Sequence, residues 1–106
     1  MSDRRAALVA RFRAGAADRL RRVRHALGEA EAGRAGPEQL KEVARELHTV
    51  KGEARMLGMA ALSELLHAVE SAVVRPAGAA PDPAACATAL GLLDAAATAL
   101  RVDAAP

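Results

Sequence analysis

Apolar side chains recur every three or four residues along four segments of the chain, the spacing that gathers them on one face of an α-helix. The spacing predicts helices over residues 3–32, 38–57, 59–75 and 84–101. The second stripe is the most regular and consists of Leu40, Val43, Leu47, Val50, Ala54 and Leu57. The other stripes are Leu8, Phe12, Ala16, Leu20, Val23, Leu27 and Ala30; Leu62, Leu66, Val69 and Val73; and Cys86, Leu90, Leu93, Ala97 and Leu100.

Glycine and proline separate these segments. Residues 33–37 read Gly-Arg-Ala-Gly-Pro, Gly58 marks a turn, and residues 76–83 contain three prolines. Four amphipathic helices with short connections predict an all-α fold, an antiparallel up-and-down four-helix bundle. The composition agrees, because 29 alanines, one Phe and no Ile, Trp or Tyr leave little from which to build a sheet core. We expect one domain over residues 1–102 and the start of a linker over 103–106, so that the chain is the first piece of a longer protein.

The net charge is +2, and it is unevenly distributed: residues 1–34 carry +5 and residues 60–106 carry −3. A basic first helix raises nucleic acid or anionic lipid as partners. No aromatic stacking platform accompanies the arginines, so the favoured interpretation is a solvated helix face, with no nucleic acid and no membrane as partner. The single Cys86 excludes an internal disulfide and favours a cytoplasmic location. We also expect no transmembrane segment, because no apolar run approaches the roughly 18 residues that one needs.

His48 lies on the polar side of the second helix. On an ideal helical wheel it falls about 140° from the centre of the apolar stripe, and four cations lie within about 60° of it. They are Lys41, Arg45, Lys51 and Arg55. An exposed imidazole among cations suits a site that handles an anion, although an ordinary surface histidine gives the same pattern. Gly52 favours the interpretation as a functional site. A glycine inside an exposed helix lowers helix stability by about 1 kcal/mol relative to alanine, and here it opens access to the imidazole.

The third helix supplies partners for this histidine. If the second and third helices form a hairpin that pivots near Met59, His48 is level with Glu70, and Lys51 is level with His67. A carboxylate that accepts a hydrogen bond from one ring nitrogen fixes the tautomer and raises the basicity of the other. The pattern predicts that Glu70 orients His48 through Nδ1 and leaves Nε2 free to attack phosphorus. His67 is alternatively a half-buried side chain at the helix interface.

Residues 47–58, Leu-His-Thr-Val-Lys-Gly-Glu-Ala-Arg-Met-Leu-Gly, resemble the His-x-x-Lys-Gly-x-x-x-x-Leu-Gly signature of histidine phosphotransfer (HPt) domains. The downstream His67-Ala-Val-Glu70 is similar to the P1 domain of the chemotaxis kinase CheA. Residues 51–58 look most like the CheA-type kinases of the gliding-motility ("frizzy") pathway.

The resemblance implies a role for each site residue. His48 would receive the γ-phosphoryl group of ATP from a separate kinase catalytic domain and pass it to an aspartate of a response-regulator receiver domain. Lys51 would neutralise the phosphoryl group, Gly52 would clear the approach, and Glu70 with His67 would complete the hydrogen-bond network. The domain itself would bind no nucleotide or other cofactor and would be the substrate of a CheA-like histidine kinase rather than a catalyst.

Some alternatives remain open. A standalone phosphorelay protein is one alternative, although the linker-like tail favours the first domain of a larger kinase. Arg55 and Met56 are bulkier than the residues that many relatives carry there, which we expect to alter receiver docking. A metal site at His48, His67 and Glu70 is disfavoured, because the neighbouring cations repel a metal ion. A basic helical binding bundle without phosphotransfer would instead use the arginines of the first helix.

Overall fold

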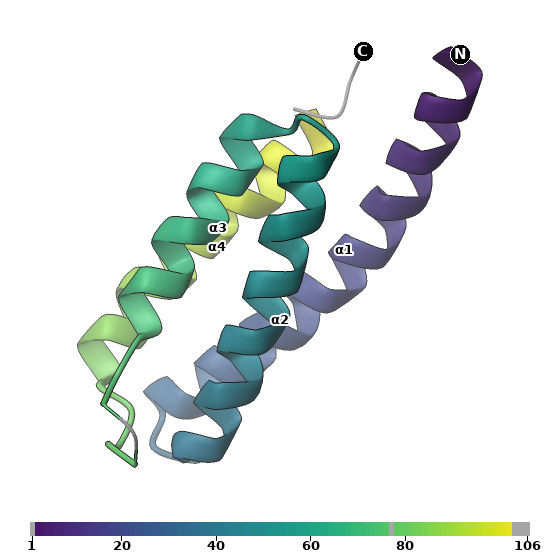
Figure 1. The fold of residues 1–106 in the computed structure, drawn as a ribbon. Coiled ribbons are helices and arrows are strands. Elements are labelled where there is room, and N and C mark those ends of the chain that lie inside the picture. Colours follow the sequence, from purple (N-terminus) through teal and green to yellow (C-terminus); the bar gives the residue numbers. More distant parts are fainter. Residues whose placement is uncertain (1, 77, 103–106) are drawn as a thin grey trace.

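The computed structural model describes residues 2–76 and 78–102 of the chain and, over that range, contains four helices and no strand. The helices are α1 (Ser2–Glu31), α2 (Pro37–Met56), α3 (Ala60–Val73) and α4 (Pro83–Val102). Each helix packs against the next, and α4 returns to α1, so that the four form an antiparallel bundle (Figure 1). The predicted all-α fold is confirmed, and every predicted helix end lies within two residues of the observed one. The segment 103–106, expected to start a linker, lies outside the described residues.

Local chemistry explains where α2 begins and ends. Pro37 is its first residue, and the backbone N–H of Gly36 just before it donates a hydrogen bond to Gln39 Oε1 at 2.8 Å. At the other end Gly58 adopts φ of +76°, a left-handed conformation that favours glycine. The N–H of Met59 then donates to the carbonyl of Ala54 at 2.9 Å and closes the turn. The hairpin between α2 and α3 therefore pivots where the sequence predicts it.

A single apolar core runs between the four helices. Leu27 of α1, Leu47 of α2 and both Leu62 and Leu66 of α3 are fully buried in it. The predicted stripes of α2 and α3 point into this core, except that Leu57, the residue after α2, is only half buried. These two helices therefore present their polar faces, including His48, outside the core.

Two stripes differ from the prediction. In α4 the buried residues include Ala89 and Ala96, whereas the predicted Leu90 and Ala97 are only half buried. The reason is that α4 packs against both α1 and α3, and small residues at the centre of its inner face allow close approach. In α1, Leu8 was expected in the core but is 46% exposed. The adjacent Val9 is buried instead and lies seven residues, about two turns, before the buried Ala16, so the inner face of α1 passes through Val9 and leaves Leu8 at its edge.

The expectation about membrane-spanning segments needs correction for α4. Its residues 83–101 are long and apolar enough, by length and composition, to cross a membrane. The sequence shows no run of large apolar side chains there, because most of the apolar residues of this segment are alanines. One such helix is weak evidence for a membrane protein, since a core helix of a soluble bundle passes the same test, and the inner face of α4 packs in the core.

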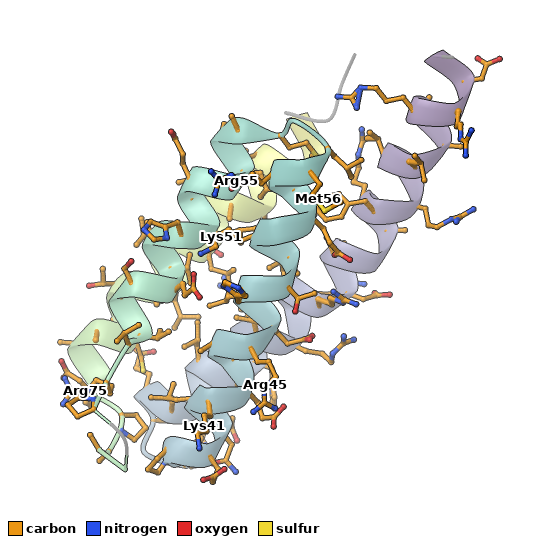
Figure 2. All side chains as sticks on the ribbon, viewed as in Figure 1. Lys41, Arg45, Lys51, Arg55, Met56 and Arg75 are labelled. Atoms are coloured by element: carbon orange, nitrogen blue, oxygen red, sulfur yellow. The ribbon has the colours of Figure 1, made fainter. Side chains whose placement is uncertain are left out.

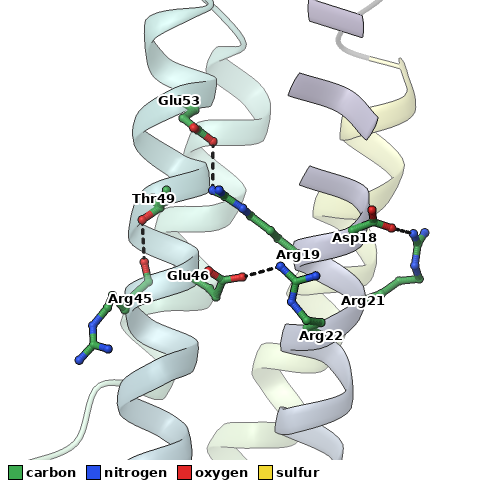
Figure 3. Close-up of polar contacts among 8 residues, drawn as sticks. All are labelled: Asp18, Arg19, Arg21, Arg22, Arg45, Glu46, Thr49 and Glu53. Carbon is green, nitrogen blue, oxygen red and sulfur yellow. Dashed lines mark hydrogen bonds and ion pairs between the residues drawn. The ribbon is translucent and has the colours of Figure 1, made fainter. Parts of the chain in front are cut away.

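Three of the eight arginines of α1 pair with acids on the neighbouring helices. Arg19 pairs with Glu53 at 3.3 Å and Arg22 with Glu46 at 3.2 Å, so two ion pairs join α1 to α2 (Figure 3). On the opposite side Arg24 pairs with Asp94 of α4. Part of the positive charge of α1 is thus used in contacts between helices, while other arginines of this helix, among them Arg4 and Arg11, lie exposed.

Candidate functional site

His48 projects from the middle of α2 into solvent. Its neighbours Leu47 and Val50 are fully buried, which turns the intervening positions outward, and 72% of the His48 side chain is exposed. The helical period alone therefore exposes the imidazole, as the wheel predicts. Of the other histidines, His67 lies on α3 near His48, whereas His25 is an exposed residue of α1.

One carboxylate joins the residues of the site. Glu70 Oε2 lies 3.3 Å from His48 Nδ1, and Lys51 Nζ donates a hydrogen bond to Glu70 Oε1 at 2.6 Å. His67 Nδ1 is 4.0 Å from the same Oε1 atom. The predicted contact between His48 Nδ1 and Glu70 is confirmed. Lys51, expected level with His67, bonds to Glu70 instead, because its four-carbon stem spans the one-turn difference between the two.

Glu70 is ionised at neutral pH. Burial of this carboxyl, which is 19% exposed, raises its pKa, but the hydrogen bond and charge of Lys51 and the contact with His48 outweigh that effect and hold the pKa below its ordinary value. An ionised carboxylate only accepts hydrogen bonds, so His48 Nδ1 carries the proton of the neutral imidazole. Nε2 then keeps its lone pair, and no residue in the described ranges forms a hydrogen bond with it.

The surface around the imidazole is open on the side of Gly52. A Cβ atom built at this glycine meets no atom within 4 Å, so no neighbouring helix requires a glycine there. Close packing of another helix therefore does not explain the glycine at this position, and the open space beside it agrees with the expected access to His48. This open side is continuous with the exposed face of α2.

The cations expected around His48 are spread along α2 (Figure 2). Arg45 pairs with Glu42 of its own helix at 3.0 Å, and Lys51 is held by Glu70. Lys41 and Arg55 are exposed and form no ion pair with any residue that the structure describes. The polar face of α2 therefore keeps positive charge available to an anionic group at His48.

A hollow beside the site was not foreseen from the sequence. Residues of both helices of the hairpin line it: Lys51, Arg55, Gly58, Ala60, Ser63, Glu64 and His67. Ser63 and His67 are four residues apart and share one face of α3, and this spacing is the signal that a search of the sequence would have needed. Within the described ranges no group of three His, Cys, Asp or Glu side chains is arranged to hold a metal ion.

Comparison with known proteins agrees with this geometry. A curated relative, the "Gliding motility regulatory protein" of Myxococcus xanthus, is 48% identical over 64 residues, which are 59% of this chain and 8% of that protein. The chain therefore spans less than a tenth of that relative, and the expected resemblance to gliding-motility proteins is confirmed. No solved structure shows a significant match.

The Hpt domain family matches residues 7–103, nearly the whole chain, including both helices of the hairpin that carries the site. The match covers the paired histidine and glutamate as well as the complete four-helix pattern. An exposed imidazole on such a bundle is what a histidine phosphotransfer domain requires. The chain accordingly belongs to the Hpt domain family, the histidine phosphotransfer domains of signalling proteins.

Proposed function

We propose that His48 is the phosphoryl carrier of this domain: it accepts the γ-phosphoryl group of ATP from a kinase catalytic domain and passes it to an aspartate of a response-regulator receiver domain. The most direct support is the contact of Glu70 Oε2 with His48 Nδ1 at 3.3 Å. The His48 side chain that makes this contact is 72% exposed. It keeps the proton on Nδ1 and leaves the Nε2 lone pair toward solvent, where a phosphorus atom can approach.

The chemistry has two balanced steps. In the first, the Nε2 lone pair forms a bond to the γ-phosphorus while the bond from phosphorus to the bridging oxygen breaks and ADP leaves. The imidazole ring becomes positively charged, and the Glu70 carboxylate at Nδ1 stabilises that charge. In the second step, a carboxylate oxygen of the receiver aspartate attacks phosphorus, the N–P bond breaks, and its electron pair returns to Nε2.

The neighbouring side chains support the same steps. Lys51 Nζ, now 2.6 Å from Glu70 Oε1, sits on a flexible stem that lets the ammonium group reach phosphoryl oxygens bound to His48. His67 Nδ1, at 4.0 Å from the same carboxylate, is too far away for a hydrogen bond but places a second imidazole beside it. Gly52 leaves the approach to Nε2 open. The domain itself needs no nucleotide, cofactor or metal, because the kinase domain supplies ATP.

The parent protein is, on this proposal, a cytoplasmic CheA-like histidine kinase. The name of the Myxococcus relative and the small fraction of it that the chain spans support a phosphotransfer module within a larger signalling protein. A standalone phosphorelay protein would use the same site. Detection of the domain in native cell extract by an antibody separates the two possibilities: a band much larger than the domain that also contains a kinase core supports the kinase, and a band of about the size of the domain supports the standalone protein.

Labelling of histidine variants tests the carrier. The chain is incubated with a kinase catalytic core and γ-labelled ATP, and separately with phosphoramidate, a small phosphoryl donor that needs no kinase. We expect acid-labile label on the wild-type chain and none on His48→Gln, which stays helical because its side chain lies outside the core. His25→Gln, the matched control on α1, should label normally. Persistent label on His48→Gln would contradict the assignment.

A further inference from the structure

A hollow of about 510 Å³ lies between α2 and α3 beside the site. Lys51 and Arg55 line it from α2, and Ser63, Glu64 and His67 line it from α3. Arg55 and Lys51 both extend from α2 on the side that faces α3 (Figure 2). Two cations, a hydroxyl group and an imidazole therefore surround one space, together with one carboxylate.

Arg55 is the cation of this hollow that remains free. Lys51 donates a hydrogen bond to Glu70 Oε1 at 2.6 Å, whereas Arg55 is exposed and forms no ion pair with any residue in the described ranges, Glu64 included. A guanidinium group presents several N–H donors in one fixed plane, and this arrangement matches two oxygens of a phosphate group. The hollow therefore offers an unpaired donor group that suits a phosphate.

Arg55 lies on the same face of α2 as His48. It follows His48 by seven residues, which is about 10.5 Å along the helix axis and about 20° around it. Lys51 connects the two positions, because it lines the hollow and shares the Glu70 carboxylate with His48. A chain of phosphates that starts at Nε2 of His48 can therefore extend over the hollow toward the long side chain of Arg55.

Lys41 provides the corresponding position on the other side of His48. It precedes His48 by seven residues and is also exposed and without an ion pair to a described residue. The hollow that Lys41 lines contains Arg75 and Glu38 as its other charged residues, and apolar residues such as Val74. No residue of the His48 site lines that second hollow. The two sides therefore carry similar charge, and the connection with the site distinguishes the hollow at Arg55.

We propose that the hollow at Arg55 receives the β-phosphate of the ATP held by the kinase domain, an inference that rests on the proposed function of His48. As Nε2 of His48 bonds to the γ-phosphorus, the bond from that phosphorus to the bridging oxygen breaks. The electron pair of this bond stays on the oxygen, which becomes part of the β-phosphate of ADP and gains negative charge. Arg55 donates hydrogen bonds to this phosphate and stabilises the charge as it forms. The phosphoryl acceptor thus supplies a cation to the reaction that phosphorylates it.

Two phosphoryl donors test the role of Arg55. Phosphoramidate contains one phosphorus atom and releases ammonia, so it has no β-phosphate for Arg55 to bind. With the domain as the varied substrate, we expect Arg55→Gln to lower kcat/KM for phosphorylation by the kinase core and ATP at least tenfold. The same variant should take up label from phosphoramidate within twofold of wild type. Arg55→Lys, which keeps the charge, should recover most of the loss. Lys41→Gln is the matched control and should stay within twofold of wild type with both donors.

Several outcomes overturn the proposal. Labelling of Arg55→Gln by the kinase core at the wild-type rate shows that Arg55 does not contact ATP. An equal loss in Lys41→Gln shows a general attraction between net charges instead of a site. Slower labelling of Arg55→Gln by phosphoramidate as well places the effect at His48 itself. Slower transfer from phosphorylated Arg55→Gln to a receiver domain, with normal labelling by the kinase core, assigns Arg55 to the receiver.

A separate measurement distinguishes failure of this proposal from failure of the proposed function. If wild type accepts no phosphoryl group at His48, the proposed function is wrong. The hollow is then still tested by a nuclear magnetic resonance titration with inorganic pyrophosphate. The amide signals of Ser63 and His67 must shift in wild type and much less in Arg55→Gln. Unchanged signals in wild type would exclude a phosphate site in the hollow.

Discussion

At Gly52, the side chain that would stabilise the helix differs from the one that would leave His48 accessible. Glycine is a poor residue for the interior of a helix, because it loses more backbone entropy on folding than alanine does. Here the position is exposed, and nothing lies within 4 Å of an added Cβ. The helix gains nothing from glycine at this position, whereas an approaching partner of His48 gains space.

Substitutions at Gly52 should therefore separate folding from transfer. Gly52→Ala is expected to raise the free energy of unfolding by up to about 1 kcal/mol. Gly52→Gln should remain folded yet transfer phosphoryl groups at least tenfold more slowly, because its side chain occupies the approach to Nε2. Thermal melts and transfer assays on the same samples check both. Gly91→Gln, an exposed glycine in α4 with equally open surroundings, is the matched control and should transfer normally. Rapid transfer by well-folded Gly52→Gln would remove the access argument.

Glu70 is a single carboxylate on which three side chains converge, and its protonation should be visible in the pH dependence of stability. Its pKa is lowered relative to an ordinary value of 4.5. A group with a depressed pKa contributes stability above the pKa of the unfolded state and loses it as the pH falls through the lower, folded value. The contribution is thus complete at neutral pH and declines below about pH 4.5.

Unfolding measurements between pH 6 and pH 3 should show this decline. Wild type is expected to lose more stability over that interval than Glu70→Gln, which keeps the size of the side chain but does not titrate. Glu64→Gln, an exposed carboxyl on the same helix, serves as control and should follow the wild-type curve. Identical acid profiles for wild type and Glu70→Gln would show that the contacts with Lys51 and His48 do not couple protonation to folding.

At the scale of elements, the site depends on the α2–α3 hairpin, since His48 and Glu70 lie 22 residues apart in the chain and meet only across it. The turn after α2 is fixed by Gly58 and by α1 as well: Arg5 Nη2 donates a hydrogen bond to the carbonyl of Leu57 at 2.9 Å. This carbonyl is one of those left without a helical partner at the end of α2. The first turns of α1 therefore help to hold the end of the hairpin.

Arg5→Ala should loosen this end. We expect a loss of about 0.5–1 kcal/mol in the free energy of unfolding, the usual net value of one hydrogen bond. Hydrogen exchange of the amides at 57–59 should become faster, while exchange at His48 stays unchanged. Arg4→Ala removes a neighbouring exposed arginine for which the structure records no such bond and should leave both quantities as in wild type. Equal behaviour of the two variants would exclude a capping role for Arg5.

At the scale of the whole molecule, one core carries the stability while the site lies outside it. Leu47, adjacent to His48, is fully buried, whereas His48 is 72% exposed. Neighbouring positions in α2 thus serve separate purposes, because the helical turn directs their side chains about 100° apart. Changes in the core and changes in the site should affect different measurements.

Leu47→Ala should show this separation. The cavity that it leaves is expected to lower the free energy of unfolding by about 2–5 kcal/mol. At temperatures where the variant is still folded, phosphorylation by phosphoramidate should proceed at the wild-type rate, because no atom of the site is removed. Thr49→Ala, on the exposed side of His48, is the control for a change beside the site and should leave the melting temperature almost unchanged. A folded Leu47→Ala that fails to label would show that core and site are not separable.

The sequence by itself determined the four helices, the hairpin and the pairing of His48 with Glu70. Helical period and turn residues are local properties, so the stripes of α2 and α3 and the turn at Gly58 are legible without knowledge of the neighbours. Once the turn is placed, the rise per residue fixes which residues of two antiparallel helices are level. The core of the site follows from these two facts.

Only the tertiary structure decided which of several equivalent partners a side chain meets. Lys51 was expected level with His67 but bonds to Glu70, and Arg22 of α1 pairs with Glu46. Long flexible side chains can reach several charged groups, and only the folded arrangement of the helices decides which of these groups lies within reach. Leu8 belongs to a regular apolar stripe yet remains exposed while the adjacent Val9 is buried, since packing decides which residues of an apolar helix face meet the neighbouring helices. Periodicity tells which face of a helix is apolar, but the lengths and crossing of the neighbouring helices decide how much of that face is covered.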